Sequence, residues 1–457
     1  MPDYKVAIIG AGFCGTMVAV HLARLAPDMP VALIERNPIP GRGLAYGTTD
    51  PDHLLNVRAE QMGAFADDQR HFWHWLEAQP DINLSRQDFA PRMVYGRYLG
   101  EILAQARAAN PRLSLLTRRI ADVRQLQNGF ELRSDDGRIL TSESIVLALG
   151  NFPPDQLSGN ADEMNPYAPE TWKDLAGHGD ILIVGTGLTS LDLVVTMAKT
   201  KQTGKIHLLS RHGLLPREHT NPESHILKMR PPYPATALGL CKWIRQEIAD
   251  APDTPWQAVI DSLRPLNQQL WQSLNRDEQR RFMRHLRAYW DVHRHRCAPK
   301  IMDAYRGLEQ AGRLALHHGT IIKQTTHEKG VDVLWRPRGS MSPETLAVQK
   351  IVRCTGPQAD FRRLGDPLVQ NLLKANLITA DDLRLGIESE DYTACNAAGH
   401  KVDGLYVLGS LLKGKLYESI AVPELREQAA DVARIITKEK NGCARPAPSA
   451  AKTSDYR

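Results

Sequence analysis

Two glycine-rich turns are the part of this chain whose residue types and spacing point most directly to chemistry. The first turn contains Gly10, Gly12 and Gly15, and the second contains Gly185, Gly187 and Ser190. Each turn follows a short apolar, β-prone run and precedes a stretch with a helical pattern. Turns of this kind bind dinucleotide pyrophosphates. Two of them predict a protein that holds two dinucleotides together, and the usual chemistry of such a pair is hydride transfer between a nicotinamide and a flavin.

The first turn carries the complete residue pattern of a dinucleotide site. Gly10 allows the tight turn, Gly12 lets the backbone approach the pyrophosphate, and Gly15 lets the next helix pack close to the sheet. A helix expected from about residue 16 to 25 would offer its N-terminal N–H groups to the phosphates. Glu35 ends the next apolar run, at the distance where a carboxylate binds ribose hydroxyls. We therefore predict a dinucleotide here.

The second turn differs in two positions that bear on its nucleotide. Ser190 replaces the third glycine, and it is still small enough for close packing of helix on strand. The following strand, expected at 205–209, ends in Ser210 and Arg211 where an acid would favour NADH. A guanidinium and a hydroxyl suit a 2′-phosphate, so the sequence predicts NADPH rather than NADH. The alternative is that Arg211 only faces solvent.

Composition limits the remaining classes of function. The chain has 457 residues, too many for one ordinary core, and its formal charge of +5 does not by itself imply nucleic acid or membrane. The six cysteines form no C-x-x-C pair, which argues against a disulfide framework, a zinc ribbon and a redox dithiol. We expect no metal. The N-terminus has no secretory signal and no apolar run reaches membrane-spanning length, so a cytoplasmic location is expected.

The order of the segments predicts an α/β fold with two doubly wound Rossmann-like domains, the second inserted in the first, and a helical insertion. Two short strands, at 144–150 and 350–356, each end in glycine and lead to a proline-containing turn, as the crossings between domains would. The expected parts are 1–155 (first dinucleotide domain), 156–234 (second, with its core at 178–215), 235–310 (helical insertion), 311–437 (return to the second and then the first domain) and 438–457 (disordered tail).

The helical insertion is the most individual part of the sequence. It is rich in aromatic residues, which fit either a cap that closes over the cofactor or a subdomain with tryptophans in its core. The run from His293 to Arg296 is a basic cluster, and its two histidines are spaced wrongly for a helical zinc pair. Two interpretations of the cluster remain, anion binding or a solvated helix end. Arg217 and His219 are further candidates for the phosphate pocket.

Three further segments carry a resemblance to known proteins. They are Gly41-Arg42-Gly43-Leu44-Ala45-Tyr46-Gly47 followed by the run 53–57, the run 290–299, and the run 404–410 followed by the run 423–429. With the two glycine turns they make the chain resemble the flavoproteins with two dinucleotide-binding domains, which include flavin-dependent monooxygenases and pyridine-nucleotide oxidoreductases. More closely, it resembles bacterial members described only as FAD/NAD(P)-binding proteins.

The resemblance implies FAD at the first turn and names further ligands for it. Arg42 would contact an FAD phosphate, and Asn56 would lie beside the isoalloxazine ring. Gly409 would lie against the ribityl chain, and Ser410 stands where many relatives have an aspartate. Glu424 belongs to the start of a helix whose N–H groups would face the flavin pyrimidine.

Departures from the resemblance restrict the expected activity. The phenylalanine–glycine–histidine signature of N-oxygenating and Baeyer–Villiger flavoproteins is missing, and so are the paired cysteines of disulfide reductases. We expect an FAD-dependent oxidoreductase, reduced by NADPH, that passes electrons to oxygen or an organic acceptor, with monooxygenation as one outcome. The alternatives are an oxidase or dehydrogenase with a vestigial nicotinamide domain, and a non-catalytic FAD-binding redox sensor. The sequence names no catalytic residue and no substrate.

Overall fold

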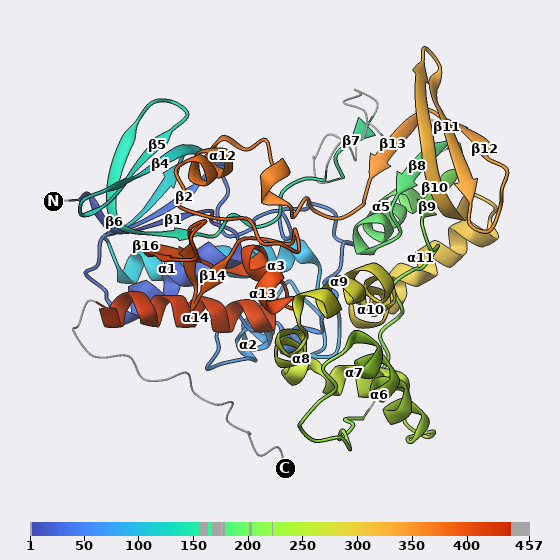
Figure 1. The fold of residues 1–457 in the computed structure, drawn as a ribbon, viewed down its shortest axis with the longest axis horizontal. Coiled ribbons are helices and arrows are strands. Elements are labelled where there is room, and N and C mark those ends of the chain that lie inside the picture. Colours follow the sequence, from blue (N-terminus) through green and yellow to red (C-terminus); the bar gives the residue numbers. More distant parts are fainter. Residues whose placement is uncertain are drawn as a thin grey trace.

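A computed structural model describes residues 2–154, 163–166, 175, 179–200, 203–221 and 223–439. Its first sheet has the order β14-β15-β16-β6-β1-β2-β3, with β4 and β5 joined to it through β6 (Figure 1). The strands are β1 (Tyr4–Ile9), β2 (Val31–Glu35), β3 (Leu113–Thr117), β4 (Ile120–Leu126), β5 (Gly129–Ser134), β6 (Ile139–Leu147), β14 (Ser389–Glu390), β15 (Thr393–Cys395) and β16 (Lys401–Val407). The parallel neighbours of β1 are β2 and β6, so its apolar residues are buried on both faces.

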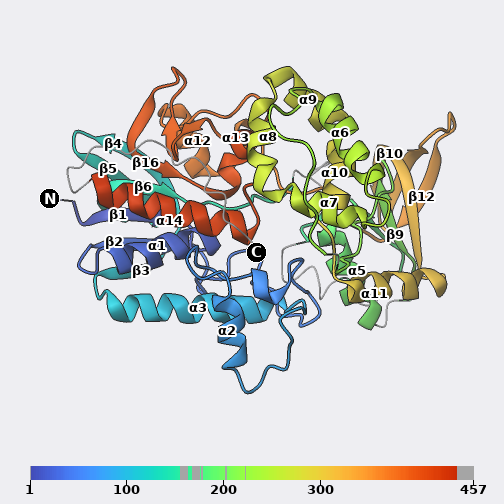
Figure 2. The same cartoon turned by 90° about the horizontal axis from the view of Figure 1, so that it is seen from below.

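Helices cover this first sheet and bring the end of the chain back to it. The helices are α1 (Phe13–Leu25), α2 (His71–Glu77), α3 (Arg92–Ala109), α12 (Pro367–Lys374), α13 (Lys413–Leu416) and α14 (Val422–Glu439). Figure 2 shows α1 between α14 and α3, and α1 contacts both. The helix α1 begins at Phe13 rather than near residue 16, so Gly15 lies in its first turn. The strand expected at 144–150 is part of β6, which ends at Leu147.

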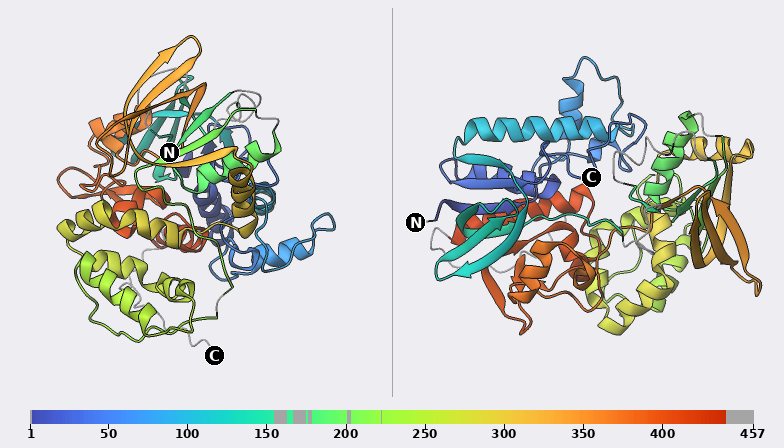
Figure 3. Two further views of the ribbon diagram at one scale, coloured as in Figure 1. Left: turned by 90° about the vertical axis from the view of Figure 1, so that its right-hand side faces the viewer. Right: turned by 90° about the horizontal axis from the view of Figure 1, so that it is seen from above.

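The second sheet has the order β12-β11-β10-β9-β8-β13-β7 and forms the core of the other lobe (Figure 3). Its strands are β7 (Glu163–Met164), β8 (Ile181–Val184), β9 (Ile206–Ser210), β10 (Leu314–His327), β11 (Gly330–Pro337), β12 (Glu344–Val348) and β13 (Lys350–Arg353). The central strand β8 is parallel to β9 and β13, as a dinucleotide-binding sheet requires. The helices α5 (Leu188–Lys199) and α11 (Pro299–Gln310) pack together beside it.

The chain crosses between the two sheets twice, so the second sheet is inserted in the first. It leaves after β6, completes β7 to β13, and returns for β14 to β16. The two crossing segments run side by side, since Phe152 and Gln358 form an antiparallel bridge. An ion pair between Arg92 on α3 and Asp192 on α5, 2.7 Å apart, also joins the lobes. The predicted α/β class with two doubly wound sheets is therefore correct.

Helices dominate the segment from 237 to 294, as the sequence predicts. They are α6 (Ala237–Ala249), α7 (Trp256–Ser262), α8 (Asn267–Ser273), α9 (Arg276–His285) and α10 (Arg287–Arg294). Figure 1 shows this cluster beside α13 and the start of α14. Trp243 and Trp271 are buried in it, and the indole of Trp271 donates to the Gly414 carbonyl oxygen at 3.0 Å. The cluster is therefore anchored to the C-terminal part of the first lobe.

The C-terminal boundary differs slightly from the expected one. A disordered tail was predicted from residue 438, but α14 continues to Glu439 because its apolar face packs along α1. The remainder of that prediction, 440–457, lies outside the described residues. Within the described part of the chain, no helix is long and apolar enough to cross a membrane.

Candidate functional site

The first glycine turn leaves no room for side chains at two of its three positions. Gly10 has φ of +101°, and a Cβ there would lie 2.3 Å from the carbonyl oxygen of Ala148, which directly follows β6. A Cβ at Gly15 would lie 1.8 Å from the Gly10 carbonyl oxygen. Both distances are far below contact, so the strand–turn–helix geometry requires glycine. Gly12 faces Gly43, and these two side-chain-free residues keep the backbone accessible.

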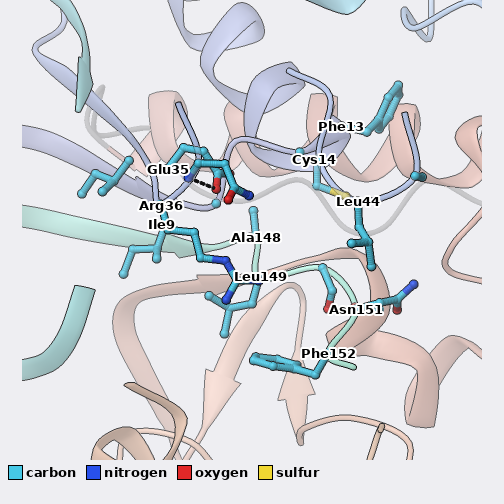
Figure 4. Close-up of a pocket in the computed structure, with 18 of the residues that line it drawn as sticks. Ile9, Phe13, Cys14, Glu35, Arg36, Leu44, Ala148, Leu149, Asn151 and Phe152 are labelled. Carbon is cyan, nitrogen blue, oxygen red and sulfur yellow. Dashed lines mark hydrogen bonds between the residues drawn. The ribbon is translucent and has the colours of Figure 1, made fainter. Parts of the chain in front are cut away.

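A cavity of about 250 Å³ opens at this turn (Figure 4). Gly10, Gly12 and Arg42 line it, as predicted, and the figure shows it between the Cys14 end of α1 and the segment from Ala148 to Phe152. Glu35 lines it too and is held firmly: its carboxylate accepts from the Ala11 N–H at 2.9 Å and from the Asn37 N–H at 3.0 Å. The carboxylate therefore stands at the ribose position with its orientation already fixed.

Arginines that the sequence did not single out also line this cavity. They are Arg36, Arg118 and Arg119. Pairing of Glu35 with Thr117 in the parallel ladder puts the start of the β3–β4 connection beside the end of β2. The Arg118 N–H then donates to the Glu35 carbonyl oxygen at 2.9 Å. Arg119 is paired with Asp366, another lining residue, at 3.3 Å, so Arg36, Arg42 and Arg118 supply the positive charge that phosphates require.

The C-terminal segment closes another side of the cavity. Ser410 lines it, and its hydroxyl donates to the Gly150 carbonyl oxygen at 2.6 Å. Gly409 has φ of +76°, a Cβ there would meet Cys14 Sγ at 3.0 Å, and its N–H donates to Gln428 Oε1 at 2.8 Å. Gln428, which the sequence did not single out, is buried and its Nε2 has no partner among the described residues. Gln428 is not among the residues that line the cavity, so it positions Gly409 from behind.

Two predicted cofactor contacts lie elsewhere than expected. Glu424 makes a two-point ion pair with Arg264 at 2.9 and 3.0 Å, which joins α14 to the helical cluster and occupies the carboxylate. Asn56 is not among the residues that line the cavity, and its carbonyl oxygen lies 2.9 Å from His219 Nε2. Both residues therefore join separate parts of the chain. Because their partners are distant in sequence, neither contact could be read from local pattern.

Arg217 and His219 lie in a segment that contacts α10, where the Arg217 N–H donates to the Val292 carbonyl oxygen at 2.9 Å. Their segment pairs with the helical cluster, where Glu218 forms a parallel bridge with Cys297. Burial, followed by the charge of Arg296, lowers the pKa of His219 from 6.5 to about 4. The imidazole is therefore neutral at pH 7 and carries no positive charge for a phosphate.

His219 should make stability sensitive to acid. Its folded pKa is depressed, so its contribution is complete above pH 6.5 and is lost as pH falls toward 4. The free energy of unfolding of the wild type should fall between about pH 7.5 and about pH 5. Urea unfolding should show that this fall is about 2 kcal/mol smaller in His219→Gln. His74→Gln, at an exposed position, is the control. An equal pH dependence in wild type and His219→Gln would contradict the prediction.

The second glycine turn has the same construction as the first. Gly185 has φ of +113°, and a Cβ there would lie 2.2 Å from the Cys354 carbonyl oxygen. A Cβ at Gly187 would meet nothing within 4 Å, so the turn is open on that side. Ser190 is fully buried and its hydroxyl donates to the Gly187 carbonyl oxygen at 2.6 Å. The serine thus preserves the geometry that a third glycine provides.

A basic group stands at the end of β9, but its members differ from those expected. The Ser210 hydroxyl lies 3.0 Å from Thr186 Oγ1 and accepts from the Gly213 N–H at 3.0 Å, so it holds the turn itself. Arg211 is exposed. Arg338, which follows β11, lies with Nη1 2.8 Å from His212 Nδ1. The partial burial of His212 and the charges of Arg338 and Arg211 lower its pKa.

The basic run in the helical cluster is engaged in ion pairs. Arg294 faces Glu418 and Arg296 faces Asp261. His293 Nδ1 lies 2.7 Å from the Tyr289 carbonyl oxygen. Among the described residues no group of histidine, cysteine, aspartate or glutamate side chains is arranged to hold a metal ion. The run therefore contributes structural contacts between α10 and its neighbours.

Comparisons with known proteins agree with this geometry. Residues 7–152 match a family described as FAD-NAD(P)-binding. Among solved structures, L-lysine 6-monooxygenase from Pseudomonas syringae is similar with a TM-score of 0.67 and 17% identity, over 95% of this chain and 99% of that one. An ornithine N-hydroxylase from Kutzneria sp. 744, with FADred, NADP+ and L-orn, has a TM-score of 0.62 and 14% identity over 96% and 100%.

Thioredoxin reductase from T. acidophilum is also similar, with a TM-score of 0.54 and 11% identity over 97% of this chain and 100% of that one. No curated protein matches in sequence. At these identities the likeness shows the fold and not the reaction. The chain thus has the fold of the flavoproteins with two dinucleotide-binding domains, and residues 7–152 carry the match to the FAD-NAD(P)-binding family.

Proposed function

We propose that this protein is an FAD-dependent oxidoreductase that uses NADPH as reductant and passes electrons to oxygen or to an organic acceptor. One observation carries the proposal: both glycine turns keep the steric requirements of a dinucleotide site, at Gly10 against Ala148 and at Gly185 against Cys354. A Cβ at Gly187 would meet no atom within 4 Å, so packing alone does not require glycine there, whereas the close approach of a pyrophosphate does. The construction therefore favours a working nicotinamide domain over the alternatives.

The residues of the first site fit FAD. Gly12 leaves the backbone open, Glu35 is oriented for ribose, and Arg42 with the arginines of the β3–β4 connection suits a pyrophosphate. FAD, when bound, supplies the two-electron chemistry: it accepts a hydride from NADPH and gives the electrons to the acceptor. The protein binds and orients both nucleotides. Ser410, which follows Gly409, contributes the C-terminal segment's part of the wall of the FAD cavity.

Arg211 and Arg338 are proposed to hold the 2′-phosphate of NADPH. Arg211 is exposed at the end of β9, Arg338 contacts the neighbouring His212, and no carboxylate ends β9, so a phosphate meets attraction without repulsion. Arg338 is thus a second residue that supports the predicted NADPH preference. It follows β11 and lies 126 positions after His212, which it contacts.

Anaerobic titration of the FAD-loaded protein tests this proposal. NADPH should bleach the flavin absorbance, and Arg211→Ala or Arg338→Ala should each raise the apparent Kd for NADPH by about tenfold while leaving that for NADH unchanged. Arg336→Ala, an exposed arginine on the same hairpin, is the matched control. Failure of both nucleotides to bleach the flavin would remove the proposed function. If the two variants lost affinity equally for NADPH and NADH, the assignment of Arg211 and Arg338 to the 2′-phosphate would be wrong, and the proposed function would stand.

A further inference from the structure

An apolar cavity of about 550 Å³ lies inside the helical cluster, apart from both glycine turns. Its walls come from α6, α8, α9 and α10 and from the segment that follows α13. This volume is within the range of small-molecule sites and far exceeds the voids that remain in a packed core. The cavity is therefore large enough for a small molecule and is not a packing void.

One apolar face of α6 packs against the core of the helical cluster and also lines this space. Leu240, Ile244 and Ile248 recur at the spacing of a single helical stripe, with Ala237 and Cys241 beside them. The three large side chains are only partly buried. An amphipathic helix ordinarily buries such a stripe against another element. Here a ligand would complete the burial.

The cavity is next to the proposed flavin site. Tyr417 and Glu418 line the apolar cavity, and Ile420, two residues further, lines the cofactor cavity. Two residues of chain span at most about 7 Å. The segment 417–420 forms the partition between the two cavities, and its backbone is strained. Tyr417 has φ of +57° and ψ of −63°, and the Glu418 N–H donates to the Leu416 carbonyl oxygen at 2.7 Å. That is the rare γ-turn with positive φ, a conformation that proteins keep at functional sites.

The polar groups of the wall indicate what the ligand carries. Glu418 faces Arg294 and accepts from the Trp290 indole at 3.1 Å, so the charges at the inner end are already paired. Arg245, the other cation that lines the cavity, is exposed, and His293 Nδ1 lies 2.7 Å from the Tyr289 carbonyl oxygen. Asn267 also lines the cavity, is buried, and its Nδ2 has no hydrogen-bond partner within the described residues. A buried donor of this kind needs an acceptor.

We propose that this cavity binds the organic substrate of the flavin, and that the substrate is a neutral, mainly apolar molecule with one hydrogen-bond acceptor for Asn267. The role as a substrate rests on the proposed function, whereas binding itself does not. The apolar walls take the hydrocarbon part of the molecule, and the partition at 417–420 brings it against the cofactor cavity.

Binding is measured on the FAD-loaded protein with a series of 2-alkanones from 2-hexanone to 2-dodecanone. Trp271 and Trp290 line the cavity, so ligand entry is followed by tryptophan fluorescence. Affinity should rise by about three- to fourfold for each added methylene until the cavity is full. The same ketones should protect Cys241, a wall residue, from alkylation, as read by mass spectrometry of its peptide. Affinity independent of chain length, or no protection of Cys241, would overturn the proposal.

Variants locate the binding. Ile244→Trp fills the cavity and should abolish binding, and Leu238→Trp, on the exposed face of the same helix, should leave it unchanged. Cys241→Phe is a second, smaller filling variant, and FAD content checks the folding of each. Asn267→Leu should weaken ketone binding by about tenfold and keep the dependence on chain length. Equal binding by Ile244→Trp and wild type would overturn the assignment.

The closing measurement adds 2-decanone to the NADPH reaction under air. Faster NADPH oxidation with the ketone, lost in Ile244→Trp, supports the substrate role. Binding with no flavin reduction by NADPH supports the cavity but rejects the proposed function. Flavin reduction by NADPH with no ketone binding rejects the inference and leaves the proposed function standing.

Discussion

Gly15→Ala is expected to abolish FAD retention and to lower the free energy of unfolding by about 3 kcal/mol or more. The new Cβ would lie 1.8 Å from the Gly10 carbonyl oxygen and 3.1 Å from Ile8 Cγ2. The first of these atoms is backbone that cannot move away, so α1 must shift off β1 and the N–H groups of the turn leave their positions. The FAD absorbance of the purified protein and urea unfolding measure the two effects.

Gly100→Ala is the matched control and should change stability in the opposite direction. Gly100 lies within α3, and a Cβ there would meet nothing within 4 Å. Alanine is the better helix former, so the variant should gain about 0.5–1 kcal/mol and keep its FAD. If Gly15→Ala retained both FAD and stability, the close packing of α1 on the turn would be wrong.

Glu418→Gln should lower the free energy of unfolding by about 3–5 kcal/mol. The side chains of Glu418 and Arg294 are only 4% and 10% exposed, with Oε2 and Nη2 3.7 Å apart. Glutamine can still accept from the Trp290 indole, but it leaves the Arg294 guanidinium buried without its anion. Urea unfolding at neutral pH measures the loss.

Two comparison variants isolate the buried charge. Glu388→Gln breaks a pair with Arg276 whose partners are 38% and 42% exposed, so it should cost about 0–1 kcal/mol. Replacing both partners, Arg294→Met with Glu418→Leu, should restore most of the stability because no charge is left unpaired. If the double variant were as unstable as Glu418→Gln, the ion pair itself would provide the stability. The loss in Glu418→Gln would then not come from leaving the Arg294 charge buried and unpaired.

Local pattern was sufficient for the features that depend on neighbouring residues. The turns at Gly10 and Gly185 follow from the need for positive φ where a strand meets a helix. The strands at β1, β2, β8 and β9 follow from short apolar runs, and the helical cluster follows from its periodicity. Glu35 was found because its position depends only on the length of one helix and one strand.

Contacts between distant segments were decided by the tertiary structure. Arg118 and Arg338 reach the two sites, and Gln428 reaches Gly409, because parallel pairing, a long hairpin and the return of α14 bring them there. Glu424 and Asn56 were assigned to the cofactor from local position, yet their partners Arg264 and His219 are far along the chain.

The sequence by itself determined two dinucleotide turns, the α/β class and the order of the crossings, since these depend on backbone sterics and hydrophobic periodicity within short windows. Only the tertiary structure decided which charges are paired, where the wall between the two cavities lies, and that an apolar space exists inside the helical cluster. A cavity is a property of how helices pack against one another, and the apolar stripe of α6 looks the same in sequence whether it faces a core or a ligand.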